Sequence, residues 1–388
     1  MRSLKENMSS RKKIVDSVKR VVIKIGSGAL TTKEGLNLGV INALSKDISH
    51  FMEKNRLEII LVSSGAIASG IKKMGYSQRP QSISQQQAAA AVGQSTLMLA
   101  YEEAFKTYDK KVAQILVTRD DLTNRKRYLN TRNTLFTLLH WKVIPIINEN
   151  DTVVVDEIKF GDNDNLSAMI ANLAAANLVI NLTNIDGFFD DDPRVNKDAH
   201  RISVVEKVTS KIEKTASSIP GSLGKGGMES KVKAARHVAM CGIPTIIANG
   251  TKKNIIRAIF EGREEGTLFL PQSIPMKSRK HWIAFTKSPK GKIMVDRGAE
   301  NALIKKGKSL LPSGVIAVHG RFTMGNSVIV MNQQKRGLAV GLVNYQSADV
   351  EKIMGLKTSE IEEILGYKHY DEVIHKDNLV LMDNHWEA

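Results

Sequence analysis

Hydrophobic and polar positions change from block to block between residues 20 and 270. The run 20–25 is rich in β-branched residues, and 59–62 is apolar at every position, which is typical of strands covered on both faces. The segment 37–55 instead places apolar residues at helical spacing, at Val40, Ile41, Leu44, Ile48 and Phe51. The pattern therefore predicts a strand, then a helix, then another strand.

The same alternation continues along this part of the chain. Further strands are predicted at 112–117, 143–147, 178–182 and 244–248, and further helices at 84–108, 130–140, 166–176, 229–241 and 254–261. Repeated βα units predict an α/β fold, an αβα sandwich in which helices cover both faces of a mainly parallel sheet. Alternating apolar residues within 151–160 predict a small hairpin that carries substrate loops.

The sequence changes in character after Leu270. Pro271 and Pro275 predict an interdomain linker, and a chain of 388 residues exceeds the size at which single cores stop growing. Beyond the linker lie short β-rich pieces separated by glycine, at 293–295, 314–318, 327–331 and 337–343. We therefore predict a second, small β-rich domain.

Composition narrows the classes of protein that remain. No apolar run approaches the length of a membrane span, and the first twenty residues are polar and basic, so we expect a cytoplasmic protein without a secretory signal. The single cysteine, Cys241, excludes an internal disulfide and a cysteine-based metal cluster. Because Cys241 follows Val238, Ala239 and Met240, we interpret it as a structural thiol rather than a nucleophile.

Positive charge is unevenly distributed. Lys and Arg number 56 against 40 Asp and Glu, a net charge of +16. The segment 277–308 alone holds ten basic residues and two acidic ones, Asp296 and Glu300, so half of the excess lies there. This segment indicates an anionic partner for the carboxyl-terminal part of the chain.

Asn and Asp crowd two neighbouring stretches, 148–152 and 161–168, between the strand 143–147 and the helix 166–176. These residues are poor in helix and strand interiors, so we expect loops. Open α/β sheets bind ligands in such loops at the carboxyl ends of their strands. A solvated, capped turn would explain one or two of these side chains, and the larger number favours a site for a polar small molecule.

Glycine follows three predicted strands, in the stretches 24–28, 63–66 and 224–231. Glycine lets backbone amides approach phosphate, so together these stretches indicate a phosphate site, although each alone is a weak signal. Neither a P-loop nor a complete dinucleotide fingerprint is present. Lys24 stands in an apolar strand, where it either extends to solvent or meets an anion at the strand end.

Several motifs occur in order along the first domain. They are Lys24-Ile25-Gly26-Ser27, Val62-Ser63-Ser64-Gly65-Ala66-Ile67-Ala68, Asn148-Glu149-Asn150-Asp151, Gly161-Asp162-Asn163-Asp164-Asn165-Leu166-Ser167-Ala168, Asp186-Gly187, Asp192-Pro193 and Gly226-Gly227-Met228 with Lys231. In this order they resemble the glutamate 5-kinase (γ-glutamyl kinase) group of the amino acid kinase family. The resemblance places an amino acid kinase domain at 18–270. The stretches 291–298 and 309–314 of the tail resemble the PUA domain that many members append, which places a PUA-like domain at 280–366.

This resemblance implies an activity and its partners. The implied reaction is ATP-dependent phosphorylation of the side-chain carboxylate of L-glutamate to L-glutamyl 5-phosphate, the first step of proline biosynthesis. ATP and Mg²⁺ are the implied cofactors, without a metal site made by protein residues. The resemblance also implies feedback inhibition by proline, a contact with the downstream glutamyl phosphate reductase, and a homo-oligomer.

Each site residue follows from a matching motif position. By resemblance, Lys24 and Lys231 stabilise the transferring phosphoryl group and Asp164 positions both lysines, while Gly26 and Gly65 supply backbone amides. The residues implied for glutamate are Ser64, Asn148, Asp151 and Asn163. Those implied for ATP, besides Lys24, Gly26 and Gly65, are Thr183, Asn184, Lys225, Gly226, Gly227, Met228, Glu229, Ser230 and Lys231. Asn184 and Lys225 depart from the Asp and Thr customary in the family, and both positions concern nucleotide contacts.

The chemistry of the implied reaction fits the residues present. A carboxylate with a pKa near 4.3 is already ionised at neutral pH, so transfer of a phosphoryl group to it needs no base. The reaction needs alignment and positive charge instead, so no His or Cys nucleophile is expected. Two alternatives stay open: another enzyme of this fold acting on aspartate, acetylglutamate, carbamate or a nucleoside monophosphate, and an RNA-binding protein that uses the basic tail.

Overall fold

The computed structural model describes residues 11–32, 34–76, 78–154, 163–218, 227–272, 280, 283 and 289–382. The chain divides into two compact units, Met1–Pro275 and Met276–Ala388. Most of the predicted hairpin at 151–160, the acid Asp162 and the loop residues Lys225 and Gly226 lie outside the described residues. No helix in the described ranges is long and apolar enough to cross a membrane.

The first unit is built on an eight-stranded sheet with the order β5-β6-β4-β1-β7-β9-β10-β8. Neighbouring strands from β5 to β9 pair in parallel, whereas β10 runs antiparallel to β9 and parallel to β8. The strands are β1 (Arg20–Ile25), β4 (Glu58–Ser63), β5 (Val112–Val117), β6 (Ile144–Glu149), β7 (Leu178–Thr183), β8 (Val204–Val205), β9 (Thr245–Asn249) and β10 (Thr267–Phe269). The predicted, mainly parallel sheet is confirmed. A separate short pair is formed by β2 (Thr31–Thr32) and β3 (Gly35–Leu36).

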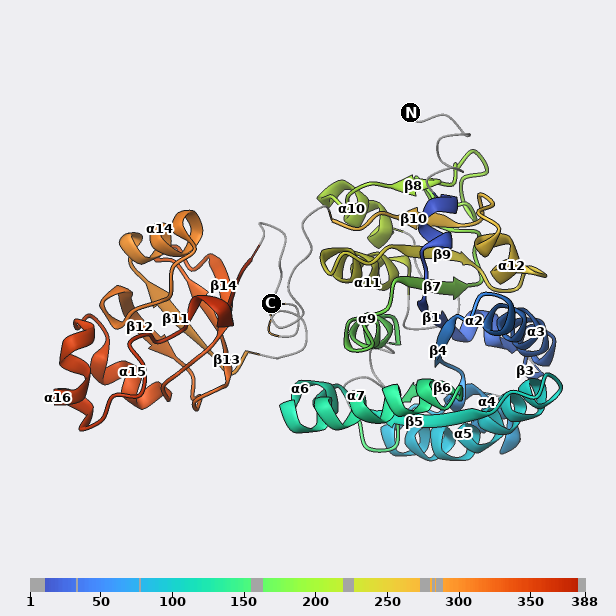
Figure 1. The fold of residues 1–388 in the computed structure, drawn as a ribbon, viewed down its shortest axis with the longest axis horizontal. Coiled ribbons are helices and arrows are strands. Elements are labelled where there is room, and N and C mark those ends of the chain that lie inside the picture. The colour runs from blue at the N-terminus through green and yellow to red at the C-terminus, as the bar shows by residue number, and fades with distance from the viewer. Residues whose placement is uncertain are drawn as a thin grey trace. The chain divides into compact units, whose positions relative to one another are not determined.

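Helices cover both faces of this sheet, which confirms the αβα sandwich (Figure 1). One face packs against α3 (Leu38–Lys54), α5 (Ile83–Lys106) and α12 (Ile255–Phe260). The opposite face packs against α7 (Arg125–His140), α9 (Asn163–Leu173) and α11 (Met228–Met240). The shorter helices are α2 (Ser27–Leu30), α4 (Ala66–Lys73), α6 (Arg119–Thr123) and α10 (Ser210–Ser218).

The pleat of β1 decides where Lys24 points. Ile23 and Ile25 belong to the core on the α3 and α5 side, and Val22 to the core on the α9 and α11 side. Since alternate residues of a strand face opposite sides, Lys24 shares the face of Val22. The lysine is therefore directed toward α9 and α11.

Some predicted helix starts were wrong. Helix α9 begins at Asn163, three positions before the predicted 166, so Asn163 and Asp164 lie in its first turn and not in a loop. Helix α7 begins at Arg125, because Asn124 caps it by accepting hydrogen bonds from the backbone N–H groups of Lys126 and Arg127. Polar residues that suit helix caps also occur in the first turn of helices. Both helices were therefore predicted to begin too late in the sequence.

Helices α4 and α5 pack unusually closely. A Cβ added at Gly70 of α4 would lie 1.7 Å from the carbonyl oxygen of Ala89, and one at Gly93 of α5 would lie 1.8 Å from that of Ala66. No side chain fits at either position. The two glycines therefore hold α5 directly against the first turn of α4, which follows strand β4.

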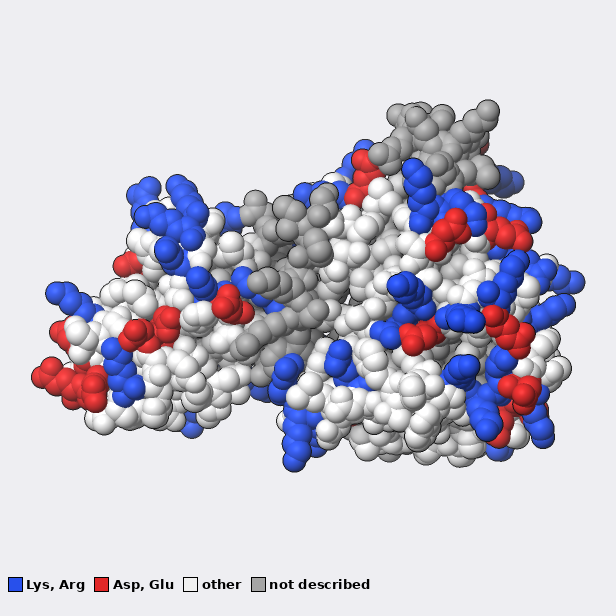
Figure 2. All heavy atoms as spheres, in the orientation of Figure 1, with Lys and Arg blue, Asp and Glu red and all other residues white. Residues whose placement is uncertain are grey.

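The second unit is the predicted small β-rich domain, with five strands in the order β12-β11-β13-β14-β15. These strands are β11 (Gly291–Val295), β12 (Val315–His319), β13 (Ser327–Met331), β14 (Gly337–Leu342) and β15 (Leu379–Leu381). Its helices, which the sequence pattern did not indicate, are α14 (Arg297–Lys306), α15 (Ser347–Ile353) and α16 (Ile361–Leu365), with short 3₁₀ turns η1 (Pro312–Gly314), η2 (Thr358–Glu360) and η3 (Lys376–Asn378). Figure 2 shows basic side chains gathered over α14 and acidic ones over α16.

Candidate active site

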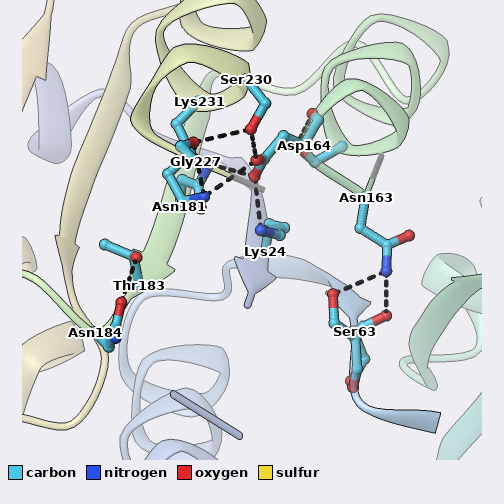
Figure 3. Close-up of polar contacts among 12 residues, drawn as sticks. Lys24, Ser63, Asn163, Asp164, Asn181, Thr183, Asn184, Gly227, Ser230 and Lys231 are labelled. Atoms are coloured by element: carbon cyan, nitrogen blue, oxygen red, sulfur yellow. Dashed lines mark hydrogen bonds and ion pairs between the residues drawn. The ribbon is translucent and has the colours of Figure 1, made fainter. Parts of the chain in front are cut away.

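Asp164 lies at the centre of a buried group of charges between α9, β1 and α11 (Figure 3). Its Oδ1 lies 2.6 Å from Nζ of Lys24, and its Oδ2 lies 3.2 Å from Nζ of Lys231. All three side chains are at most 7% exposed. The anion that Lys24 was expected to meet at the end of its strand is thus the carboxylate of Asp164.

Two neutral side chains also hold this carboxylate. Nδ2 of Asn181 donates to Oδ1 at 2.9 Å, and Oγ of Ser230 donates to Oδ2 at 2.6 Å. Asn181 is aligned with Lys24 across the parallel pair β1 and β7, so both reach the carboxylate from the same face of the sheet. Asn181 was not among the predicted site residues, although it is a polar residue within the otherwise apolar run 178–182.

The electrostatic balance of the cluster keeps Asp164 ionised. Burial alone would raise the pKa of Asp164, but the charges of Lys231 and Lys24, together with hydrogen bonds from Lys24 and Ser230, hold it well below its usual value. Two lysines and one carboxylate therefore share a site that is shielded from water. Their excess of positive charge suits an incoming anion such as a phosphoryl group.

A cluster of amide and hydroxyl groups adjoins this charged centre, because Asn163 directly precedes Asp164. Nδ2 of Asn163 lies 3.1 Å from the carbonyl oxygen of Ser63, 2.8 Å from Oγ of Ser64 and 3.1 Å from Oδ1 of Asn148. The structure therefore brings Ser64, Asn148 and Asn163 together. Asp151 lies in the turn that follows β6.

Several residues of this region lie at the carboxyl ends of parallel strands. Ser63 ends β4, Thr183 ends β7, and Asn148 is the last residue but one of β6. Lys24 holds the corresponding position in β1. This edge is where open α/β sheets bind ligands, so the location of the two clusters is that of a substrate site.

Gly26 and Gly65, the two glycines expected to supply backbone amides, differ in their backbone surroundings. The N–H of Gly26, expected to contact phosphate, donates here to the carbonyl oxygen of Leu182 at 2.9 Å. A Cβ at Gly26 would lie 3.4 Å from Nζ of Lys24, so glycine here leaves room beside the lysine. Gly65 has a φ of 102°, a conformation that favours glycine, and directly precedes α4.

The residues expected to bind the nucleotide lie in two places. Asn184 follows β7 and approaches Gly28, where an added Cβ would lie 3.1 Å from its Cγ. On α11, the carbonyl oxygen of Gly227 accepts hydrogen bonds from Ser230 and Lys231. Two other predicted contacts on α11 are turned elsewhere: Met228 is buried in the core, and Glu229 forms an ion pair with Lys233.

Among the described residues, no group of three or more His, Cys, Asp or Glu side chains could hold a metal ion. Asp164 is engaged by two lysines, an amide and a hydroxyl group, as described above.

The sequence is similar to those of known phosphotransferases. Residues 19–249 match the amino acid kinase family, and residues 291–365 match the PUA domain. The chain is 52% identical to the glutamate 5-kinase of Geobacter sulfurreducens over 96% of this chain and 100% of that protein, and 53% identical to that of Geobacter metallireducens with the same coverage. It is 49% identical to the glutamate 5-kinase of Caldanaerobacter subterraneus, over 94% of this chain and 98% of that protein. A solved structure of UMP kinase from Bacillus anthracis is 16% identical, with a TM-score of 0.46, over 66% of this chain and 97% of that one.

Proposed function

The chain belongs to the glutamate 5-kinases of the amino acid kinase family, and we propose that it transfers the γ-phosphoryl group of ATP to the side-chain carboxylate of L-glutamate. The product is L-glutamyl 5-phosphate, from which proline biosynthesis proceeds. The observation that carries the proposal is the buried group of Lys24, Asp164 and Lys231 beside the amides of Asn148 and Asn163. A charged site for phosphoryl transfer thus adjoins a polar site for an amino acid.

The proposed reaction uses these groups in defined roles. An oxygen of the ionised glutamate side chain forms a bond to the γ-phosphorus as the bond between that phosphorus and the ADP oxygen breaks. Lys24 and Lys231 stabilise negative charge on the transferring group, and Asp164 keeps their ammonium groups a short distance apart. Mg²⁺ bound to the phosphates of ATP would supply positive charge that neutralises the leaving ADP.

The α-carboxylate and α-ammonium groups of glutamate require two kinds of hydrogen-bond partner. Its α-carboxylate needs hydrogen-bond donors, which the hydroxyl of Ser64 and the amide of Asn148 provide. Its α-ammonium needs acceptors, a role for the carboxylate of Asp151 and the amide oxygen of Asn163. Proline carries the same two groups, so we propose that it inhibits by binding at this site. Contact with glutamyl phosphate reductase and a homo-oligomeric state are further parts of the proposal.

The direct test is to trap the acyl phosphate with hydroxylamine. The purified full-length chain is incubated with ATP, Mg²⁺ and each amino acid of a panel, and hydroxamate is measured. We expect product from L-glutamate and none from aspartate or acetylglutamate. Product from another acceptor, with none from glutamate, would reject the assignment.

Kinetics of two variants test the proposed roles. Lys231→Ala should lower kcat and kcat/KM together, because the lysine acts mainly in the transition state. Asp151→Ala should raise the KM for glutamate, because the carboxylate acts in substrate binding. Normal kcat in the first variant, or an unchanged KM in the second, would contradict the respective role.

Nucleic-acid binding by the second unit is a separate proposal. It is supported by the exposed lysines Lys305, Lys306 and Lys308 at the end of α14, which belong to the basic segment 277–308. Part of that segment, 277–279, 281–282 and 284–288, lies outside the described residues. Binding of RNA should weaken steeply as salt rises. Binding that is insensitive to salt, or retained after charge reversal of these three lysines, would argue against this role.

A further inference from the structure

Helix α5 presents a row of polar side chains to the substrate-binding loops. Nε2 of Gln87 donates to the carbonyl oxygen of Val154 at 3.3 Å, Oε1 of Gln94 accepts from Nδ2 of Asn148 at 2.9 Å, and the hydroxyl of Tyr101 lies 3.0 Å from Oγ of Ser63. Gln87, Gln94 and Tyr101 are spaced by seven residues, close to two helical turns, so they lie on one face. The proposed reaction gives none of them a role.

The contact of Gln94 is of special interest because Asn148 belongs to the proposed glutamate site. Oδ1 of Asn148 accepts a hydrogen bond from the backbone N–H of Glu149 at 2.9 Å. A backbone N–H can only donate, so this bond fixes which side of the Asn148 amide is the oxygen. Nδ2 must then face Gln94, and Gln94 must present its oxygen.

A second backbone group fixes the amide of Asn163. Its Nδ2 lies against the carbonyl oxygen of Ser63, which can only accept, and against Oδ1 of Asn148. Oδ1 of Asn163 therefore faces the other way. That oxygen is buried and has no hydrogen-bond partner in the described part of the chain.

These orientations determine which polar groups are left for a ligand. Oγ of Ser64 accepts from Asn163, so its own hydroxyl hydrogen can be donated. Asn148 has two hydrogens on Nδ2, of which one is donated to Gln94. The site thus offers donors from Ser64 and Asn148 and an acceptor from Asn163. An α-amino acid needs both kinds, donors for its carboxylate and an acceptor for its ammonium group.

We propose that Gln94 is a positioning residue for the amino acid substrate, acting through the amide of Asn148. By accepting one hydrogen from Nδ2, it holds the amide plane so that the second hydrogen is directed to the ligand. Gly93 supports this role, because a Cβ there would lie 1.8 Å from the carbonyl oxygen of Ala66, close to the Ser64 loop. The close packing of α5 on α4 therefore fixes the distance from which Gln94 reaches Asn148.

The inference rests on the proposed glutamate kinase activity and is tested with the full-length chain. Gln94→Met preserves the length of the side chain and removes the acceptor, and Gln94→Lys is a second variant that cannot accept. Both should raise the KM for glutamate roughly tenfold, the usual effect of one hydrogen bond, with kcat and the KM for ATP nearly unchanged. Gln94→Glu keeps an acceptor, so its glutamate KM should lie closer to wild type.

A double-variant cycle separates positioning from a general structural effect. If Gln94 acts through Asn148, adding Gln94→Met to Asn148→Ala should change the glutamate KM no further. Gln85→Met is the matched control, since Gln85 is an exposed glutamine of the same helix and should leave the kinetics unchanged.

Each outcome has a defined meaning. A wild-type KM in Gln94→Met, or additive effects in the cycle, would overturn the role of Gln94 while leaving the kinase assignment intact. A Gln94→Glu variant worse than Gln94→Met would also overturn it, because that result would place Nε2 on the substrate carboxylate. No turnover of glutamate by the wild-type chain would instead reject the proposed function, and this inference with it.

Discussion

Replacing Asp164 with asparagine tests the central charge cluster most directly. Asp164→Asn preserves the shape of the side chain and its capacity to bond with Asn181 and Ser230. It removes the negative charge that Lys24 and Lys231 share, and leaves both buried lysines beside a neutral amide. The variant therefore isolates the electrostatic role of the carboxylate from its role in packing.

The expected loss of stability is large. Removing one partner of a buried ion pair costs about 3–5 kcal/mol of unfolding free energy, because the remaining charge loses a buried counter-charge. At about 2–4 °C per kcal/mol for a domain of this size, Tm should fall by on the order of 10 °C. The lysines also lose their common anchor, so kcat should fall by roughly a hundredfold, as misplacement of reacting groups typically produces.

Thermal unfolding with and without an anionic ligand is the assay. MgATP should raise the Tm of Asp164→Asn more than that of the wild type, because its phosphates supply the missing negative charge. Adding Lys24→Met to the variant should recover part of the lost stability by removing one of the two buried positive charges. If Asp164→Asn melts at the wild-type temperature, or Lys24→Met lowers Tm further, the electrostatic reasoning is refuted.

Three more predictions follow from the described contacts. The pKa of Asp164 is lower in the folded chain than in the unfolded chain. Its stabilising contribution is therefore complete above the unfolded pKa of about 3.9 and is lost as pH falls through the folded pKa. The difference in Tm between wild type and Asp164→Asn should accordingly narrow between about pH 5 and 2. Burial raises the pKa of Asp47, whose Oδ2 accepts a hydrogen bond from the N–H of Arg257. The charged form is therefore disfavoured, and Asp47→Asn should stabilise the folded chain at pH 7 and have no such effect below the unfolded pKa of Asp47; denaturant unfolding at both pH values measures this difference. Gly93→Ala should lower the free energy of unfolding by about 3 kcal/mol or more, because the added Cβ would clash with the carbonyl oxygen of Ala66. A Tm within about 2 °C of wild type would mean that α4 and α5 can separate at little cost in free energy.

Periodicity was enough to predict the architecture because it reports burial on each face of an element. Strands such as β4 and β7 are covered on both sides, so their apolar runs stood out without knowledge of their partners. Element ends were less predictable. Asn163 and Asp164 look like loop residues in the sequence, yet they form the first turn of α9, where their neighbours in space make the position favourable.

The sequence by itself determined the fold class, the two-unit organisation and the likeness to glutamate 5-kinases, because these depend on patterns and ordered motifs along the chain. The sequence also showed that Lys24, a charged residue in an apolar strand, must either extend to solvent or meet an anion. The resemblance indicated Asp164 as the residue that positions Lys24 and Lys231. Only the tertiary structure showed that Asn181 shares this carboxylate and that the N–H of Gly26 is already bonded. Gln94 and Asn148 lie 54 positions apart in sequence, and only the packing of α5 brings them together. Contacts between distant residues depend on how elements pack, and packing leaves no local mark in the sequence.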